Sequence, residues 1–389
     1  MRTTPSGASV SNPRRIVHVI GAFIAGGAER FVVELCFELK ARGFDVAVWA
    51  LSSRTDEVGL EMQRALSDRG IEIALGPQVK VRWPTILWYR EQVRRSSPDL
   101  IHLHTPNTEM VHAAASLCIG ERFAGRLFRT VHSIKRPTAA LPRLAYAMNR
   151  EATSIAVSQA AAETHRSMID APLFTVSNGV SFTQPVRDQE LSWNAKRGLG
   201  LDPNVQHCLH LGRMGGDSLA SAPKAHDVLI QAWRRSEKGL DGHTLHLLGD
   251  GPLRHELERL AEDDPSIVFH GIRSDVAQWL LAADGLLFPS RIEGLPLAAI
   301  EGIGAGLPCV LSDIGPLREL EPPAATYVPV DDVGALAQAI REFRPVLVNA
   351  EQTLAFRTRF SIQTAADGYI ARYQQRNESR SLPAQALVA

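Results

Sequence analysis

Two glutamates, Glu293 and Glu301, lie eight positions apart in the segment RIEGLPLAAIEGIGAGLP, residues 291–308. A Gly-Leu-Pro turn precedes a helical pattern, which predicts that the peptide groups of Gly294 and Leu295 face a ligand at a helix N-terminus. With a helical rise of about 1.5 Å per residue, the two carboxylates lie roughly 8–12 Å apart. That separation would let one carboxylate hold a sugar hydroxyl and the other hold a ribose diol.

The segment resembles the E-x7-E element of the retaining, nucleotide-sugar-dependent glycosyltransferases of family 4, which have the GT-B fold. The resemblance extends over nearly the whole chain, from Ile16 to about Gln375. It implies that Glu293 orients the donor sugar and Glu301 the ribose. Glutamates at this spacing also occur on solvated helix faces, but the Gly-Leu-Pro turn and the trailing GAGLP favour a binding role.

Two cations are candidates for binding a diphosphate leaving group. Arg213 follows the apolar stretch HCLHL, and Lys224 opens the helical pattern KAHDVLIQAW. They match the arginine and lysine that hold the pyrophosphate in the family. The spacing departs from the family, because MGGDSLASAP separates two residues that are usually only a few positions apart. Arginine can bind a phosphate bidentately, whereas lysine acts as a point charge.

A metal ion could serve the same purpose, but the sequence does not favour one. No acidic DxD motif stands at a strand end where the resemblance would place it. The pairs Asp263-Asp264 and Asp331-Asp332 occur in contexts typical of turns and helix caps. We therefore expect no metal and no bound cofactor, with the nucleoside diphosphate sugar as co-substrate.

The first half of the chain contains a glycine-rich turn, GAFIAGGAER. It is neither GxGxxG nor a P-loop, so it predicts no dinucleotide site of those types. The GGAER string resembles a turn of many bacterial family members. Gly26 and Gly27 at a helix start would bring amides near a phosphate or an acceptor hydroxyl, or they form a plain tight turn.

Three further residues follow predicted strands. His132, in RTVHSIKRP, is placed at the cleft edge, where the resemblance implies contact with the donor sugar. His104 is either an acceptor-side residue or a structural one. In FHGIRSDV, which matches the family turn that receives the base, Ile272 would supply backbone contacts. Arg273 either covers the base or stays in solvent.

Short apolar strands alternate with helical patterns through both halves of the 389-residue chain. This pattern predicts two doubly wound, Rossmann-like α/β domains facing each other across a cleft, with ligands at the carboxyl ends of the strands. The expected divisions are a disordered N-terminus at 1–15, an acceptor-side domain at 16–185, a nucleotide-sugar-binding domain at 186–361, and, by resemblance, a helix crossing back to the first domain with a tail at 362–389.

Cysteine usage and charge bear on the compartment and the partners. The four cysteines are scattered without a CxxC pair, which favours reduced thiols in the cytoplasm. Residues 1–185 hold 22 Lys and Arg against 16 Asp and Glu, and the remainder holds 20 against 26. The basic, aromatic stretch at 79–95 is either a membrane-surface patch or a solvated helix with tryptophans in the core. No nucleic-acid motif is present.

The leading interpretation is a cytoplasmic retaining glycosyltransferase, either free or peripheral on the inner membrane face, that acts on a glycan or polyprenyl-linked acceptor in surface-polysaccharide or glycoconjugate synthesis. A UDP-sugar is favoured, with a GDP-sugar next. No second carboxylate is placed for a two-carboxylate route, so the resemblance implies front-face displacement. The alternatives are a same-fold epimerase or hydrolase, and a catalytically silent nucleotide-sugar-binding subunit.

Overall fold

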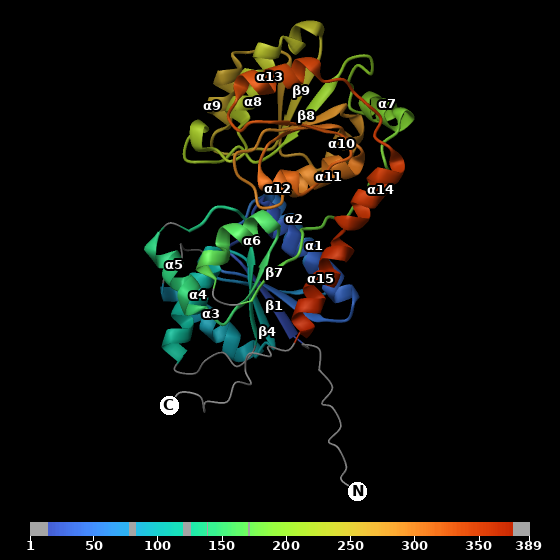
Figure 1. Cartoon of the computed structure of the whole chain (residues 1–389). Coiled ribbons are helices and arrows are strands. Elements are labelled where there is room, and N and C mark those ends of the chain that lie inside the picture. The colour runs from blue at the N-terminus through green and yellow to red at the C-terminus, as the bar shows by residue number, and fades with distance from the viewer. Residues whose placement is uncertain (1–14, 78–82, 120–125, 138, 170–171, 376–389) are drawn as a thin grey trace, which may run out of the picture.

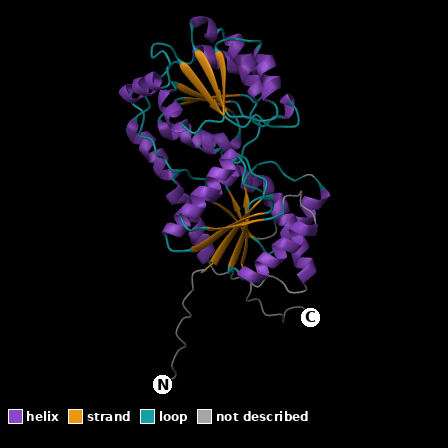
Figure 2. Cartoon of the chain, turned by 180° about the vertical axis from the view of Figure 1, so that it is seen from behind, coloured by secondary structure: helices purple, strands orange, loops and turns teal. Residues whose placement is uncertain are grey.

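The protein forms two parallel sheets, one above the other, each covered by helices on both faces (Figures 1 and 2). The computed structural model describes residues 15–77, 83–119, 126–137, 139–169 and 172–375. The N-terminus predicted to be disordered therefore lies, except for Arg15, outside the described residues, as does the tail at 376–389. Among the described residues, no helix is both long and apolar enough to cross a membrane.

The first sheet contains seven parallel strands in the order β3-β2-β1-β4-β5-β6-β7. Its strands are β1 (Arg15–Ile20), β2 (Asp45–Ala50), β3 (Glu72–Leu75), β4 (Leu100–Leu103), β5 (Arg126–Val131), β6 (Thr153–Ala156) and β7 (Leu173–Thr175). Its helices are α1 (Gly27–Ala41), α2 (Glu57–Asp68), α3 (Trp83–Ser96), α4 (Pro106–Ile119), α5 (Ala140–Met148) and α6 (Gln159–His165), followed by the 3-10 turn η1 (Arg166–Met168).

The second sheet contains six parallel strands in the order β10-β9-β8-β11-β12-β13. Its strands are β8 (His207–Leu211), β9 (Thr244–Leu248), β10 (Ile267–Gly271), β11 (Gly285–Phe288), β12 (Cys309–Ser312) and β13 (Ala325–Val328). Its helices are α7 (Gln189–Gly198), α8 (His226–Ser236), α9 (Arg254–Ala261), α10 (Val276–Ala282), α11 (Leu297–Ala305), α12 (Gly315–Arg318) and α13 (Val333–Glu342), with 3-10 turns η2 (Leu219–Ser221) and η3 (Lys238–Asp241). The predicted pair of doubly wound α/β domains is confirmed.

The last two helices, α14 (Ala350–Arg359) and α15 (Ile362–Gln374), lead the chain from the second domain back to the first (Figure 1). α15 packs beside α1, and its Tyr369 and Tyr373 are fully buried. The Tyr373 hydroxyl lies 2.6 Å from His102 Nδ1 on β4. The expected crossing helix is therefore part of the first domain's core.

Small residues allow α11 to pack closely against its surroundings. A Cβ on Gly304 would lie 2.1 Å from the ring of Phe182, in the segment that joins the domains, and one on Gly302 would lie 2.8 Å from Leu286. Larger side chains at these two positions would push the helix away. The Gly-Leu-Pro turn precedes this helix, and Pro296 is its N-cap with an extended backbone.

Candidate functional site

The carboxyl ends of strands from both sheets meet where the two domains touch. Glu293 follows β11, and its carbonyl oxygen accepts a hydrogen bond from Ile134 N–H of the first domain at 3.2 Å. A Cβ on Gly294 would lie only 2.0 Å from the carbonyl oxygen of His132. Glycine is therefore needed at position 294, because the turn after β11 lies directly against the loop after β5.

Lys224 and Glu293 form an ion pair in this cleft. The Lys224 ammonium lies 2.5 Å from Glu293 Oε1, and Glu293 is 7 % exposed. The Lys224 ammonium also lies 5.3 Å from the centre of the Phe288 ring. The long insertion before Lys224 therefore does not keep this lysine away from the motif glutamate.

Arg291 explains how that insertion is held. Its guanidinium donates to the carbonyl oxygens of Leu219 at 3.0 Å and Ala222 at 2.9 Å, and it pairs with Asp227 at the start of α8. These bonds fasten both the insertion and the first turn of α8 to the chain just before Glu293. No role for Arg291 was predicted from the sequence, although it stands two residues before the glutamate.

Glu301 is paired with a cation from the other domain. Arg30 Nη2 on α1 lies 2.5 Å from Glu301 Oε1. Burial raises the pKa of Glu301, and the positive charge of Arg30 opposes that rise. Arg30 also bonds Glu34 at 3.1 Å, and Glu34 accepts from the Ser181 N–H at 2.8 Å. The four residues connect α1, the interdomain segment and α11.

Sequence reasoning missed Arg30 as a site residue. The available signal was a carboxylate at position 301 in an otherwise apolar helical pattern, since a buried carboxylate requires a cation. The GGAER string supplies such a cation at its last position.

Arg213 is exposed and lies two residues after the end of β8. Within the described ranges, its guanidinium makes no ion pair or hydrogen bond. It is close enough to Glu29 for its charge to oppose the rise that burial causes in the pKa of Glu29. The side chain of Arg213 is thus available to an anionic ligand.

The glycine-rich turn, for which the sequence left a phosphate site, an acceptor site and a plain tight turn open, has a carboxylate beside it. Gly26 is the N-cap of α1, and a Cβ on it would lie 2.2 Å from Glu29 Oε2. The space beside Gly27 is open, because a Cβ there would contact nothing within 4 Å. Since Glu29 lies over Gly26, an acceptor hydroxyl suits this turn better than a phosphate.

The turn after Glu293 presents backbone donors. The N–H groups of Gly294 and Leu295 have no acceptor in the part of the chain that the structure describes. The Leu295 carbonyl accepts a hydrogen bond from Asn178 Nδ2 at 2.8 Å, across the domain junction. Asn178 therefore helps to orient the turn, a role that its Asn-Gly sequence context did not reveal.

His132 is the last member of a chain of hydrogen-bonded imidazoles. His18 Nδ1 lies 2.9 Å from His104 Nε2, and His104 Nδ1 lies 3.1 Å from His132 Nε2. Burial lowers the pKa of His132 to about 4, so the ring is neutral near pH 7. No described residue bonds its Nδ1. The hydrogen bond from His104 therefore orients the His132 ring, and His132 Nδ1 remains available to a ligand.

His18, His102 and His104 have nitrogens close enough to suggest a metal site. However, the three rings are stacked, with centroids 4.3–5.3 Å apart. His102 uses both nitrogens on the hydroxyls of Tyr373 and Thr130. Stacked rings do not direct their lone pairs to one point, so these histidines are better explained as core packing.

The predicted base-binding turn lies at the end of β10. Ile272 is 52 % exposed, and the turn before it is set by Gly271, which has a φ of +66°. Arg273 pairs with Asp275 at 2.6 Å. Elsewhere, Asp332 caps α13 by accepting from Ala335 N–H, which agrees with the cap role expected from the sequence.

The structure thus brings Lys224, Glu293, Gly294, Leu295 and His132 together at the domain junction. Arg213 lies near the glycine-rich turn with Gly26 and Gly27, whereas Glu301 faces α1 farther along α11. Ile272 belongs to a separate turn. Lys224 and the amides of Gly294 and Leu295, which have no acceptor among the described residues, lie beside the Glu293 carboxylate. This arrangement can bind a diphosphate next to a polyol.

Comparisons with known proteins agree with this arrangement. Residues 25–184 match the family model described as Glycosyltransferase Family 4, and residues 206–344 match that of Glycosyl transferases group 1. The lipopolysaccharide core biosynthesis glycosyltransferase LpsD of Rhizobium meliloti is 35% identical over 35% of this chain and 43% of its own length. The mannosyltransferase LpsB of the same organism is 27% identical over 53% of this chain and 62% of its own length. The chain therefore matches about half the length of these relatives.

Solved structures share the fold. Anabaena Alr3699/HepE in complex with UDP and glucose superimposes with a TM-score of 0.73, at 19% identity, over 92% of this chain and 99% of that one. WaaG, a glycosyltransferase involved in lipopolysaccharide biosynthesis, gives a TM-score of 0.63 at 15% identity, over 90% and 95% of the two chains.

Proposed function

Because the chain belongs to glycosyltransferase family 4, we propose that it transfers a sugar with retention from a nucleoside diphosphate sugar to a glycan or lipid-linked acceptor. A UDP-sugar is the favoured donor and a GDP-sugar the next, and the reaction would serve surface-polysaccharide or glycoconjugate assembly in the cytoplasm. The observation that carries the proposal is the Lys224–Glu293 pair, which lies beside the amides of Gly294 and Leu295, and neither amide has an acceptor among the described residues. HepE, whose structures contain UDP and UDP-glucose, supports the choice of nucleotide by likeness of fold.

The leaving diphosphate would be stabilised by fixed charges and dipoles. Lys224 and Arg213 supply the positive charge, and the Gly294 and Leu295 amides add hydrogen bonds at the start of α11. On donor binding, Lys224 would turn from Glu293 towards the phosphates. This set of groups gives the leaving group its compensation without a metal ion.

The two glutamates then act as positioning residues. Glu293, released by Lys224, would accept hydrogen bonds from hydroxyls of the transferred sugar. Glu301 would exchange Arg30 for the ribose diol. His132 would bond a sugar hydroxyl through its Nδ1, because its Nε2 is already used by His104. The acceptor would approach from the side of Gly26, Gly27 and Glu29.

Retention is proposed to occur on one face of the sugar. A double-displacement route needs a nucleophilic carboxylate about 5 Å from an acid. In the proposed complex Glu293 binds hydroxyls of the transferred sugar and Glu301 binds the ribose, so neither glutamate serves as that nucleophile. In a front-face route, the departing phosphate oxygen takes the proton of the acceptor hydroxyl as the C–O bond to the diphosphate breaks and the new glycosidic bond forms.

The test begins with a thermal-shift screen against UDP, GDP and their common sugars, followed by release of nucleoside diphosphate with a panel of acceptors. Glu293→Ala and Arg213→Ala should each lower acceptor-dependent turnover about tenfold or more. Arg64→Ala, an exposed change on α2, is the matched control. Near-normal turnover in both site variants would overturn the site assignment.

The same assay separates the alternatives. Donor consumption without an acceptor would indicate a hydrolase, and conversion of the donor to its epimer would indicate an epimerase. Donor binding without turnover across the acceptor panel would favour a silent binding subunit.

A further inference from the structure

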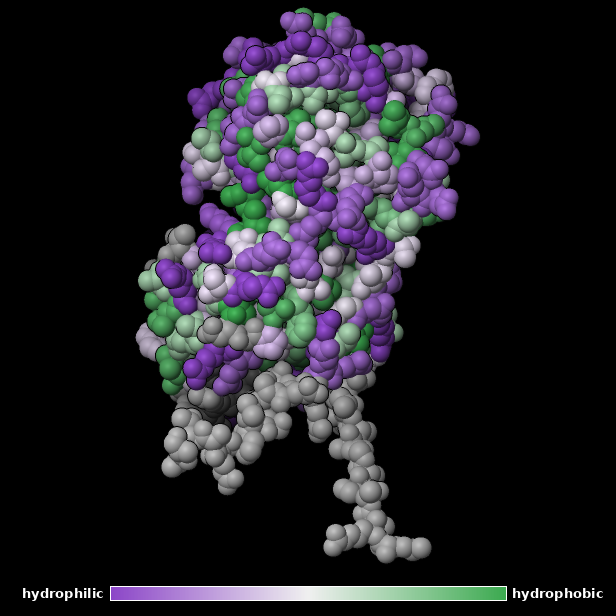
Figure 3. Space-filling view, in the orientation of Figure 1, coloured by the Kyte–Doolittle hydropathy of each residue, from purple (hydrophilic) through white to green (hydrophobic). Residues whose placement is uncertain are grey.

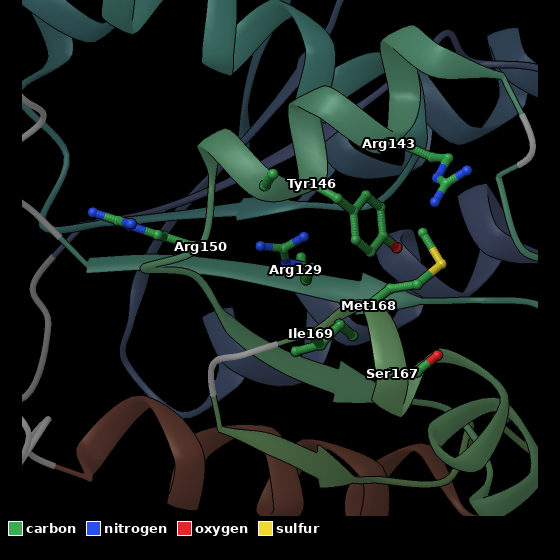
Figure 4. Close-up of a pocket in the computed structure, with 8 residues that line it drawn as sticks. Arg129, Arg143, Tyr146, Arg150, Ser167, Met168 and Ile169 are labelled. Carbon is green, nitrogen blue, oxygen red and sulfur yellow. The ribbon is translucent and has the colours of Figure 1, made fainter.

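A second concave site lies on the first domain, outside the donor cleft. It is a cavity of about 190 Å³ between α5, the turn that follows α5, and η1. It is lined by Arg129, Arg143, Tyr146, Ala147, Arg150, Ser167, Met168 and Ile169 (Figure 4). Pockets for drug-sized ligands measure roughly 300–1,000 Å³. This cavity therefore suits a small group rather than a sugar nucleotide.

The cavity is rich in positive charge. Arg143 and Arg150 are exposed on opposite sides of Tyr146, and neither guanidinium has a partner in the described ranges (Figure 4). Arg129, at 2 % exposure, forms the floor below Tyr146, and its Nε has no acceptor among the described residues. The acidic partner of Arg129 is Glu109, at 2.9 Å. Three guanidiniums against this carboxylate leave an excess of positive charge.

That excess is reinforced by burial. Burial raises the pKa of Glu109 to about 7, despite the opposing charge of Arg129. This rise in pKa favours the neutral form of Glu109 and so weakens its compensation of the Arg129 charge. An anion about the size of a phosphate group would neutralise the excess positive charge of the cavity.

The surface beside the cavity is apolar. Leu141 and Leu144 of α5 are 70 % and 55 % exposed, and Met148 follows on the same face of the helix. Leu117 of the neighbouring α4 and Trp83 of α3 are also largely exposed. Figure 3 shows hydrophobic residues gathered along the edge of this domain where α4 and α5 lie.

These observations refine the expectation for residues 79–95. Residues 79–82 lie outside the described residues, and the remainder forms most of α3. Trp83 is exposed, but Tyr89 is buried in the core, and Arg94 and Arg95 pair with Glu91. Arg143 and Arg150, on and beside α5, have no partner among the described residues and lie next to the cavity.

We propose that α5 and its cavity bind an anionic phospholipid at a membrane surface. The headgroup phosphate enters the cavity between Arg143 and Arg150, and Leu141, Leu144 and Met148 enter the acyl region. Guanidiniums can bind phosphate bidentately, and apolar side chains beside cations suit the membrane interface. The site shares no residue with the donor cleft, so this proposal stands or fails independently of the proposed transferase.

The experiment is co-sedimentation of the full chain with vesicles of phosphatidylcholine alone or with 30 mol% phosphatidylglycerol added, a composition of about one anionic lipid in three. Wild-type protein should bind the anionic vesicles at least about tenfold more tightly. Arg143→Gln with Arg150→Gln should weaken that binding by about 30-fold, since each cation at an anionic surface contributes about tenfold or somewhat less. Leu141→Ser with Leu144→Ser should weaken it by about tenfold or more.

Matched controls separate the cavity from general charge. Arg64→Gln with Arg259→Gln removes two exposed arginines on α2 and α9 and should change binding by less than about threefold. Arg143→Lys with Arg150→Lys keeps the charge but loses the bidentate geometry, and should recover only part of the affinity. Thermal melting checks that each variant is folded.

Three results would overturn the proposal. One is equal binding of anionic vesicles by the wild type and the Arg143/Arg150 variant. Another is equal loss in that variant and in the Arg64/Arg259 control, which would indicate general charge attraction. The third is saturable binding of inorganic phosphate that depends on Arg143 and Arg150 without vesicle binding, which would assign the cavity to a soluble phosphate.

Discussion

The two motif glutamates differ in the origin of the cation that each one binds. Glu293 pairs with Lys224 of its own domain, whereas Glu301 pairs with Arg30 of the other domain. The first pair can persist in any arrangement of the domains. The second exists only while α1 and α11 are close. One glutamate therefore reports on the second domain alone, and the other on the contact between the two domains.

The largest effect is expected from a fall in pH, because it should lower the unfolding free energy of the domains that hold both ion pairs. Burial lowers the pKa of His132, His112 and His210 to about 4 and that of His18 to about 3. Unfolded histidines bind protons near pH 6.5, so the free energy of unfolding should be largest above that pH and fall towards pH 4. Each tenfold difference in proton affinity between the folded and unfolded states corresponds to about 1.4 kcal/mol per histidine.

Denaturant titrations between pH 7.5 and 4.5 measure this loss. Glu109, with its pKa raised to about 7, acts in the opposite direction between about pH 4.5 and 7, but as one group against several histidines. An unfolding free energy that stays constant from pH 7 to pH 5 would contradict the prediction.

The next largest effect is expected from Lys224→Ala. The change removes a cation proposed to bind the diphosphate, and it leaves the buried Glu293 carboxylate unpaired. Turnover should fall about a hundredfold, as when one stabilising donor is removed from a transition state. Steady-state kinetics with the best donor measures it, and Lys224→Arg, which keeps the charge, is the matched variant. A loss of less than about threefold would remove Lys224 from the site.

A smaller effect is expected from Glu301→Gln. An amide can still accept a hydrogen bond from the ribose, but it loses the charge that strengthens such bonds. The KM for the donor should rise about tenfold, with kcat changed much less, because ribose contacts are made equally in the ground and transition states. An equal fall in kcat would show instead that Glu301 acts on the reacting centre.

The smallest effect on kinetics is expected from Arg30→Met. The variant removes the cross-domain pair, and donor affinity should change by less than about threefold, because the ribose replaces Arg30 in the bound state. Small-angle scattering should show a larger radius of gyration for the donor-free variant than for the wild type, and equal values once donor is bound. Identical radii without donor would show that this pair does not hold the domains together.

The predictable part of the molecule is the part encoded by local pattern. Strand and helix alternation was enough to predict two doubly wound sheets. The E-x7-E spacing made Glu293 a candidate, and Lys224 became one through its place at a helix start and the family resemblance, although its spacing departs from the family. The Arg30–Glu301 contact joins residues far apart in the chain and depends on how two domains meet, which periodicity does not encode. The cavity beside α5 could not be predicted either, because its lining comes from β5, α5 and η1, which are separated in the sequence.

The chain of hydrogen-bonded imidazoles that ends at His132 has a fixed order of donors and acceptors. His18 Nε2 is buried without a partner among the described residues, and a bare lone pair there costs less than an unbonded N–H. His18 therefore donates through Nδ1, His104 passes on the same polarity, and His132 accepts at Nε2. The proton of His132 is then on Nδ1, so the ring offers the cleft a hydrogen-bond donor and not an acceptor. A residue deep in the first sheet thus decides which hydrogen-bonding partner the cleft accepts at its edge.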